Sequence, residues 1–220
     1  MTTAVVTGAN RGIGLEFCRQ LKARGYDVVA ACRHASTALT NLGVQVEEGV
    51  DVTDDRAIDD VARRLSGTNI DLLINNAGIL AKTDLGTLNP DTIRSQFEVN
   101  ALGPLRVTHA LLPYIRPHGK VALITSRMGS IHDNTSGGSY GYRMSKAALN
   151  IAGKSLAHDL HSRQICVALL HPGYVKTDMT QHSGPVTPRD AVTGLMARID
   201  DLNLDNSGTF WHANGDVLPW

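Results

Sequence analysis

The feature that most constrains the fold of this chain is a glycine-rich turn directly after its first apolar run. Ala4–Val6 is a short run ending in two β-branched residues, and Thr7–Gly14 follows it with glycine at positions 8, 12 and 14. From Leu15 to Leu21, apolar residues then recur at helical spacing. The sequence therefore predicts a strand, a glycine turn and a helix in succession.

This arrangement is typical of a nucleotide site. Gly8 permits a tight turn, Gly12 lets the main chain approach a pyrophosphate, and Gly14 lets the helix pack closely against the strand. Free amides at the start of the helix would meet the anion. A glycine-rich turn without a ligand would look similar, but the position directly after the first strand favours a nucleotide.

Strand-like and helical segments alternate along the rest of the chain. Strands are expected at residues 4–6, 27–32, 44–50, 71–74, 120–125, 165–170 and 208–211. Later helices are expected at about 55–66, 90–116, 142–161 and 189–199, the second of them broken near Gly103–Pro104 and Pro113. Because no linker or repeat interrupts this alternation, we expect one α/β domain over residues 1–220, with a doubly wound, mostly parallel, seven-stranded sheet.

Charge and cysteine content exclude several classes of protein. Lys and Arg together number 21, as do Asp and Glu, so the formal net charge of +0 gives no electrostatic case for nucleic acid or an anionic membrane as partner. No signal peptide is visible, and no apolar run approaches the roughly 20 residues of a membrane span. The three cysteines form no Cys-x-x-Cys pair, so we expect reduced, buried thiols in a cytoplasmic protein.

Two arginines indicate which dinucleotide is bound. In sites that prefer NAD, an acidic residue near the end of the second strand accepts hydrogen bonds from the ribose 2′-OH, whereas an arginine accommodates a 2′-phosphate. Positions 31–34 hold no acidic residue, and Arg33 follows the strand directly. Arg11 in the glycine turn adds a second positive charge, so we expect NADP rather than NAD. Asp51, after the third strand, either meets the adenine amino group or caps the next turn.

Small and amide-bearing residues follow the fourth expected strand. Asn75–Gly78 can stabilise neighbouring strands and leave room for a ribose. Farther on, Asn100 lies among apolar neighbours, and a buried amide needs hydrogen-bond partners. Asn100 either caps the break at Gly103–Pro104 or belongs to a polar site, and the local sequence does not choose between the two.

A tyrosine and a lysine follow the fifth expected strand at helical spacing. Tyr142 and Lys146 are separated by 146 − 142 = 4 positions, which places both side chains on one face of a helix. A lysine there would bring the pKa of the phenol toward neutrality and make the tyrosine a general acid or base. Tyr140 is a poorer candidate, because Met144 stands four positions after it. An ordinary surface pair would have the same spacing, so the other motifs must decide.

Together these motifs resemble the short-chain dehydrogenase/reductase family over nearly the whole chain. The shared motifs are Thr-Gly-x-x-x-Gly-x-Gly at 7–14, Asn-Asn-Ala-Gly at 75–78, Asn100, Ser126, Tyr142-x-x-x-Lys146 and Pro172-Gly173. The segments around 125–130 and 142–150 and the Val-Leu-Pro-Trp at 217–220 look like the C-factor-like group, which is similar to NADPH-dependent carbonyl reductases. The resemblance implies a single Rossmann-type domain and an oxidoreductase.

The resemblance also implies roles for individual residues. Tyr142 would donate a proton to a carbonyl oxygen and Ser126 would hydrogen-bond the same oxygen. Lys146 would bind the nicotinamide ribose and depress the pKa of the tyrosine, and Asn100 would hold a water in a proton relay. The positions carried over to the NADP site are Gly8, Asn10, Arg11, Gly12, Ile13, Gly14, Arg33, Asp51, Val52, Asn76, Ala77, Gly78, Tyr142, Lys146, Pro172, Gly173, Val175 and Thr177.

Three alternatives stay open at this point. Ser126 precedes Tyr142 by 142 − 126 = 16 positions, slightly more than is usual in the family, and Ser130 competes with it; we prefer Ser126 because it directly follows a strand. The protein is expected to reduce aldehydes or ketones, or oxidise the alcohols, but a C-factor-like signalling or regulatory protein that binds NADP is the alternative. By resemblance, a homodimer or homotetramer is expected, without a choice between them.

No metal is expected. His158 and His161 are spaced as on one helix face, but no third ligand stands nearby, so a solvated helix face is the preferred interpretation. The Thr180–Pro188 segment is short where the family often carries a longer substrate lid, which indicates an open pocket.

Overall fold

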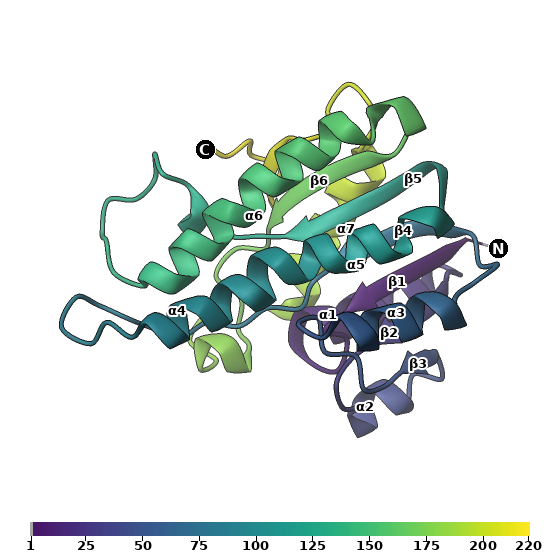
Figure 1. The fold of residues 1–220 in the computed structure, drawn as a ribbon, viewed down its shortest axis with the longest axis horizontal. Coiled ribbons are helices and arrows are strands. Elements are labelled where there is room, and N and C mark those ends of the chain that lie inside the picture. The colour runs from purple at the N-terminus through teal and green to yellow at the C-terminus, as the bar shows by residue number, and fades with distance from the viewer. Residues whose placement is uncertain (1) are drawn as a thin grey trace.

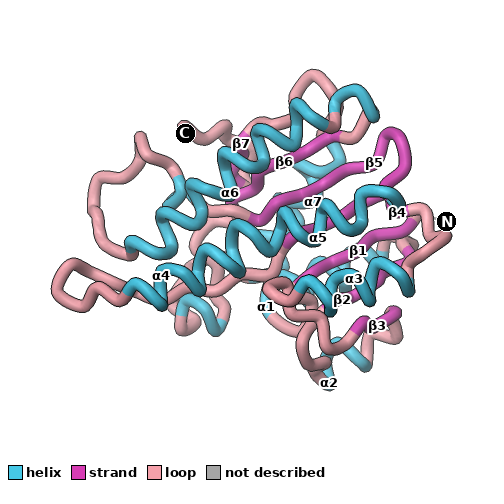
Figure 2. Tube along the Cα trace, in the orientation of Figure 1, coloured by secondary structure: helices cyan, strands magenta, loops and turns pink. Residues whose placement is uncertain are grey.

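A single parallel sheet forms the centre of the protein in a computed structural model, which describes residues 2–220 (Figures 1 and 2). Its strands are β1 (Thr3–Thr7), β2 (Asp27–Ala31), β3 (Gln45–Glu47), β4 (Ile70–Asn75), β5 (Ile115–Ile124), β6 (Cys166–His171) and β7 (Phe210–His212). They lie in the order β3-β2-β1-β4-β5-β6-β7, with every pairing parallel. The doubly wound seven-stranded sheet is confirmed, and its strand order reverses between β1 and β4, where ligands bind in such sheets.

Helices cover both faces of the sheet. They are α1 (Gly12–Ala23), α2 (Thr37–Thr40), α3 (Asp55–Arg64), α4 (Pro90–Phe97), α5 (Gly103–Leu111), α6 (Tyr140–Asp159) and α7 (Pro188–Asp201). Figure 1 shows α3, α5 and α6 in front of the sheet and α7 behind it. Apolar residues of α1 and α7 share one buried cluster, and those of α3, α5 and α6 share another.

The strands contribute alternate residues to these two cores. In β1, Val5 packs on the side of α3, α5 and α6, whereas Ala4 and Val6 pack on the side of α1 and α7. Val29 and Ala30 in β2 divide in the same way. Because both faces are covered, the central strands are apolar at nearly every position, as parallel sheets require.

The expected helix over 90–116 is the largest difference between prediction and structure. α4 ends at Phe97, a π-helical turn covers Glu98–Leu102, and α5 begins at Gly103. The expected interruption is therefore this π-helical turn just before Gly103–Pro104, and the backbone stays helical from Phe97 to Gly103. Pro104 falls in the first turn of α5, where its missing N–H is tolerated. The predicted end at about Arg116 is slightly too late: α5 ends at Leu111, a 3-10 turn covers Leu112–Tyr114, and Ile115, only 2% exposed, already pairs with Ile70 in the sheet.

Smaller differences occur in the third strand. The expected strand over 44–50 shortens to Gln45–Glu47, since Gly49 has a positive φ of 80° that ends the extended backbone. The short helix α2, capped by the Ser36 side chain, was not predicted. In contrast, α3 begins where the helix at about 55–66 was expected, and the Asp54 carboxylate caps it by accepting hydrogen bonds from the amides of Arg56 and Ala57.

Candidate active site

A cleft of about 730 Å³ opens at the carboxyl ends of the strands. The predicted residues that line it are Gly8, Asn10, Arg11, Gly12, Ile13, Gly14, Arg33, Asp51, Val52, Asn76, Ala77, Gly78, Tyr142, Lys146, Pro172 and Thr177. Residues from six separate stretches of the chain therefore meet in one place. The other predicted residues, Asn100, Ser126, Gly173 and Val175, stand behind this lining or beside it.

The glycine turn forms one wall and is braced by the segment after β4. Gly8 has a φ of 64°, and a Cβ on Gly14 would lie 2.2 Å from the Gly8 carbonyl oxygen. The side-chain nitrogen Nδ2 of Asn76 donates to the carbonyls of Thr7 and Gly8 at 3.0 and 3.2 Å. In return, the Thr7 hydroxyl accepts hydrogen bonds from the amides of Asn76 and Ala77. The predicted bracing role of the Asn-Asn-Ala-Gly motif is thus visible in these contacts.

The start of α1 suits an anion. Its N-cap residue is Arg11, whose side chain does not bond to the first-turn amides, and the first turn holds no acidic side chain. The first-turn amides therefore have no side-chain cap, and they direct the positive end of the helix dipole toward the cleft. Gly8 and Gly14 pack too closely against their neighbours to carry a Cβ, so the backbone of this turn can approach a ligand, and the site fits the diphosphate of a dinucleotide.

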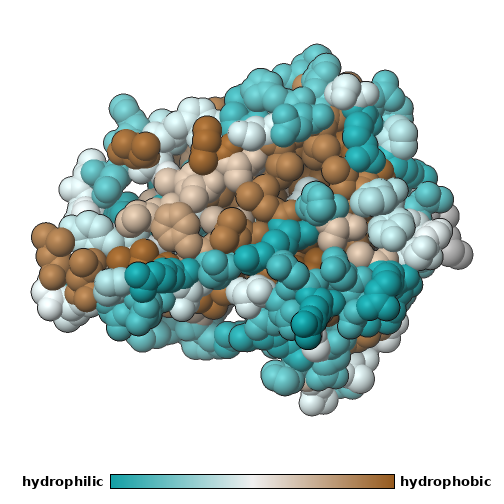
Figure 3. All heavy atoms as spheres, in the orientation of Figure 1, coloured by the Kyte–Doolittle hydropathy of each residue, from teal (hydrophilic) through white to brown (hydrophobic). Residues whose placement is uncertain are grey.

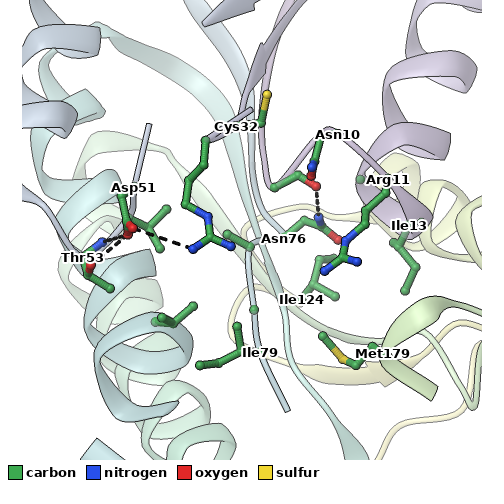
Figure 4. Close-up of a pocket in the computed structure, with 18 of the residues that line it drawn as sticks. Asn10, Arg11, Ile13, Cys32, Asp51, Thr53, Asn76, Ile79, Ile124 and Met179 are labelled. Carbon is green, nitrogen blue, oxygen red and sulfur yellow. Dashed lines mark hydrogen bonds and ion pairs between the residues drawn. The ribbon is translucent and has the colours of Figure 1, made fainter. Parts of the chain in front are cut away.

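The far end of the cleft is bordered by Arg33 and Asp51, whose charged groups are 4.0 Å apart (Figure 4). One Asp51 oxygen accepts hydrogen bonds from the Thr53 amide and hydroxyl at 2.9 and 2.8 Å. Burial acts to raise the pKa of Asp51, but these hydrogen bonds and the charge of Arg33 together lower it. Asp51 therefore orders the turn after β3 and stays ionised beside Arg33.

Tyr142 and Lys146 lie on the inner face of α6. Tyr142 is 7% exposed and Lys146 is 4% exposed, and the lysine Nζ lies 5.8 Å from the centre of the phenol ring. Nζ donates a 2.8 Å hydrogen bond to the Ile124 carbonyl oxygen at the end of β5. The expected pairing on one helix face is therefore present, and the helix presents both groups to the cleft.

The electrostatics of this pair differ from the sequence-based expectation. Burial raises the pKa of the Tyr142 phenol, and only a hydrogen bond with Ser126 acts in the opposite direction. Burial also lowers the pKa of Lys146 to about 8. The expectation that Lys146 brings the pKa of the phenol toward neutrality is wrong for the protein by itself, because burial raises this pKa by more than the hydrogen bond with Ser126 lowers it.

Ser126 and Ser130 take different positions. Ser126 follows β5, its hydroxyl accepts a hydrogen bond from the Met128 amide at 3.1 Å, and its side chain is the one that bonds with Tyr142. The Ser130 hydroxyl instead accepts from the Asp133 amide at 3.1 Å. This geometry favours Ser126 as the partner of the phenol, while Ser130 orders the loop that follows.

Asn100 lies in the π-helical turn and is fully buried. Its side-chain oxygen accepts from the Ile79 amide at 2.8 Å, and its nitrogen donates to the Ile79 carbonyl and to the Ser145 hydroxyl at 2.9 and 3.0 Å. A Cβ on Gly78 would meet the Asn100 oxygen at 3.2 Å. Asn100 therefore joins the wall after β4 to helix α6, beside the lysine, rather than capping the helix break.

The segment after β6 forms the opposite wall. Gly173 has a positive φ of 86°, and Val175 is buried and bridges to Val186, so both shape this wall from behind. Farther on, the Asp178 carboxylate lies 2.9 Å from the Arg11 guanidinium and 3.0 Å from His182 Nε2. In Figure 4 Arg11 extends from the glycine turn toward the segment that carries Met179.

Several lining residues were not predicted. Cys32, Ile79 and Asp178 are immediate chain neighbours of predicted residues, so adjacency alone would have found them, and Met179 is one position farther on. Residues of α4 and the π-helical turn, within 94–99, also line the cleft. No motif in the sequence around them predicts this, because their place in the lining depends on how the helix lies across the cleft.

Two further observations concern metal and membrane. Within residues 2–220, no group of three or more His, Cys, Asp or Glu side chains is placed to hold a metal ion, and His158 and His161 are separated by the end of α6. None of the helices in the described chain combines the length and the apolar character needed to cross a membrane.

Comparison with known proteins agrees with this geometry. A family model described as short chain dehydrogenase matches residues 2–186. The chain is 44% identical to 1-hydroxy-2-glutathionyl-2-methyl-3-butene dehydrogenase of Rhodococcus sp. (strain AD45) over the full length of both proteins. It is 46% identical to the C-signal of Myxococcus xanthus, over 69% of this chain and 93% of that protein.

A solved structure is similar over its whole length. The NADPH-bound carbonyl reductase from chicken fatty liver superposes with a TM-score of 0.92 at 30% identity, covering 100% of this chain and 99% of that one. The glycine turn, the braced Asn-Asn-Ala-Gly segment and the buried Tyr142 and Lys146 thus occur in a chain that matches the family by sequence and by fold. The protein is a member of the short-chain dehydrogenase/reductase family of oxidoreductases.

Proposed function

We propose that this protein transfers a hydride between NADPH and the carbonyl group of an aldehyde or ketone, and in reverse oxidises the alcohol. The observation that carries the proposal is the placement of Tyr142 and Lys146, buried side by side, in the same cleft as the anion-binding glycine turn. A module that only bound a nucleotide would have no need of a buried phenol and amine at that position.

NADP is the proposed cofactor. The uncapped start of α1 and the glycine turn would hold its diphosphate, and Arg33 and Arg11 would face a 2′-phosphate. The carbonyl reductase of similar fold has NADPH bound, which supports this choice. When bound, the cofactor supplies the hydride, so the protein has to position the substrate and provide a proton.

Tyr142 is the proposed proton donor. Because its pKa is raised by burial, the phenol is protonated at neutral pH, which is the form that carbonyl reduction requires. Ser126 would donate a hydrogen bond to the same carbonyl oxygen and stabilise the developing alkoxide. Lys146 would contact the nicotinamide ribose. Alcohol oxidation needs the phenolate, so that direction is expected to require a higher pH.

A regulatory role is the second candidate. The 46% identity to the C-signal of Myxococcus xanthus supports it, and in that case NADP binding would matter more than turnover. The identity to a dehydrogenase whose name specifies a glutathionyl-substituted alcohol makes thioether-bearing alcohols and their aldehydes a sensible part of any substrate panel.

The test measures oxidation of NADPH and NADH in the presence of a panel of aldehydes, quinones and diketones. It compares the wild type with Tyr142→Phe, and Tyr140→Phe is the matched control. We expect turnover with NADPH by the wild type and by Tyr140→Phe, and a loss of about 10²-fold or more in Tyr142→Phe with NADPH binding retained. Full activity of Tyr142→Phe would overturn the assignment. Tight NADPH binding without turnover of any substrate would favour the regulatory role.

The assembly and location are also proposed. Apolar residues gather on the face formed by α5 and α6 in Figure 3, where Leu102, Met144 and Ile151 are 39%, 47% and 67% exposed. A second copy of the chain covering this face would give a homodimer, or one half of a homotetramer. Gel filtration measures which of these assemblies forms. The three buried cysteines are free thiols, as in proteins of reducing compartments, which supports a cytoplasmic location.

A further inference from the structure

The loop of residues 127–139 connects the two groups proposed to act on the substrate carbonyl. It begins directly after Ser126 and ends at the start of α6, which carries Tyr142. In Figure 1 it extends beyond the N-terminal end of α6. A carbonyl oxygen within hydrogen-bond reach of both Ser126 and Tyr142 leaves the rest of the substrate next to this loop.

One side of the loop is fixed by α6. A Cβ on Gly129 would lie 2.7 Å from the main-chain carbon of Lys146, so the loop starts in contact with the helix. The Arg143 guanidinium donates to the Ser136 hydroxyl at 2.9 Å and to the Gly137 carbonyl at 3.2 Å. Within the loop, the Arg127 guanidinium donates to the Asp133 carboxylate at 2.6 Å, and the Ser130 hydroxyl accepts from the Asp133 amide. The contacts with α6 thus fix the ends of the loop, and those with Asp133 order its middle without tying it to another element.

Trp220 ties the middle of the loop to the rest of the protein. The His132 amide donates a 2.9 Å hydrogen bond to the main-chain oxygen of Trp220. The preceding residue, Ile131, is 82% exposed, so its side chain contributes little to holding this part. In Figure 1 the chain end marked C, which is Trp220, lies beside the loop.

Trp220 is in turn held by the sheet. Its indole stacks on Phe210 of β7, with ring centres 5.6 Å apart and planes 24° apart, and Phe210 is 1% exposed. The Leu218 amide also donates to the Phe210 carbonyl at 2.8 Å. The stacked rings therefore fix the position of the Trp220 carbonyl relative to a rigid strand.

We propose that Trp220 is a positioning residue that sets the range of substrates by holding the His132 end of the 127–139 loop. This inference rests on the proposed carbonyl reduction. Without the indole, the carbonyl of residue 220 is free to move away from β7, and His132 loses its fixed acceptor. The loop then moves where bulky substrates must lie, while the glycine turn and the cofactor site are untouched.

The test compares Trp220→Ala and Trp220→Phe with Val217→Ala, a matched control in the same segment whose side chain is 66% exposed. The first measurement is hydrogen exchange at the His132 amide, which needs no substrate. We expect at least 10-fold faster exchange in Trp220→Ala and wild-type exchange in Trp220→Phe, which keeps a ring on Phe210, and in Val217→Ala. Unchanged exchange in Trp220→Ala would overturn the role of Trp220.

The second measurement is kcat and KM for aldehydes of increasing size. We expect Trp220→Ala to change KM by 5-fold or more for bulky aldehydes and by less than 2-fold for the smallest, with the Kd for NADPH unchanged. An equal loss of kcat/KM for all aldehydes, together with weaker NADPH binding, would overturn the inference in favour of a purely structural role. If the wild type reduces no carbonyl at all, the proposed function and the substrate part of this inference fail together, and exchange at His132 still decides the contact.

Discussion

The Arg11 guanidinium lies 2.9 Å from the Asp178 carboxylate and joins two opposite walls of the cleft. The pair is well exposed, at 68% and 53%, so it adds little to stability. Its position matters more, because Arg11 is also one of the cations expected to meet the phosphates of NADPH. We therefore predict that Asp178→Asn lowers the KM for NADPH by about 3-fold at low salt, with less effect at high salt, where charges are screened.

The control is Asp200→Asn. Asp200 forms a similar exposed pair with Arg24, also at 2.9 Å, that links α1 to α7 away from the cleft. Its substitution should leave the KM for NADPH unchanged. Weaker NADPH binding in Asp178→Asn would show that the pair holds the walls together for the cofactor and does not compete with it.

A second prediction concerns the choice of dinucleotide. Arg33 is 67% exposed, lies 4.0 Å from Asp51 and borders the cleft, so its charge is available to a 2′-phosphate. We predict that Arg33→Ala lowers kcat/KM for NADPH by about 10-fold, roughly one charge-assisted hydrogen bond, and leaves that for NADH within 2-fold. Arg24→Ala removes a comparable charge outside the cleft as control. An equal loss with both dinucleotides would indicate that Arg33 supports the fold of the site instead.

The parts of the site that could be predicted from sequence are those whose geometry is local. Tyr142 and Lys146 share one helix, so their spacing alone places both side chains on one face. Gly8 and Gly14 are six positions apart, since 14 − 8 = 6, and belong to one continuous turn and helix start. Where backbone geometry over a few residues decides the arrangement, the amino-acid types are enough to predict it.

The relationships that were missed depend on distant parts of the chain or on burial. Arg11 and Asp178 are 167 positions apart, and no pattern in either segment specifies the other. Asn100 bonds to the main chain of Ile79, and any residue at 79 except proline would offer the same groups. The pKa of Tyr142 follows from how deeply α6 is covered, which spacing does not encode. Tertiary packing decides each of these features.

A third prediction distinguishes a structural role of Asn100 from the role of holding a water, which the family resemblance implies. Its side chain bonds to both main-chain groups of Ile79 and to Ser145. Asn100→Ala leaves the Ile79 groups without these partners, so we predict a loss of about 2–4 kcal/mol in the free energy of unfolding, measured in urea. The KM for NADPH should rise as well, because Gly78 and Ile79 line the cleft.

The matched control for Asn100 is Ser145→Ala. It removes the third of these bonds, together with that from the Ser145 hydroxyl to the Tyr142 carbonyl, and leaves the contacts to Ile79 intact. A loss of about 1 kcal/mol is expected. If Asn100→Ala instead kept full stability and lost only kcat, the residue would act through a bound water alone, as the family resemblance implies.

The fourth prediction concerns the effect of the buried Lys146 amine on stability. The pKa of Lys146 falls from 10.5 to about 8 in the folded protein, so the unfolded chain binds its proton more tightly. Below pH 8 the protonated lysine thus destabilises the fold by roughly 3 kcal/mol, and this penalty disappears as the pH rises from 8 to 10.5. Lys146→Met keeps the length of the side chain without the charge.

We predict that Lys146→Met is more stable than the wild type at pH 7 by about 1–3 kcal/mol, since the unpaired Ile124 carbonyl offsets part of the gain. Urea denaturation at several pH values measures this difference, which should shrink between pH 8 and 10.5. Lys154→Met, at a half-buried position on the same helix, controls for loss of a positive charge from α6. A stability difference that stays constant over this range would mean that the amine is not destabilised by burial, and the protein would then hold Lys146 charged without a penalty.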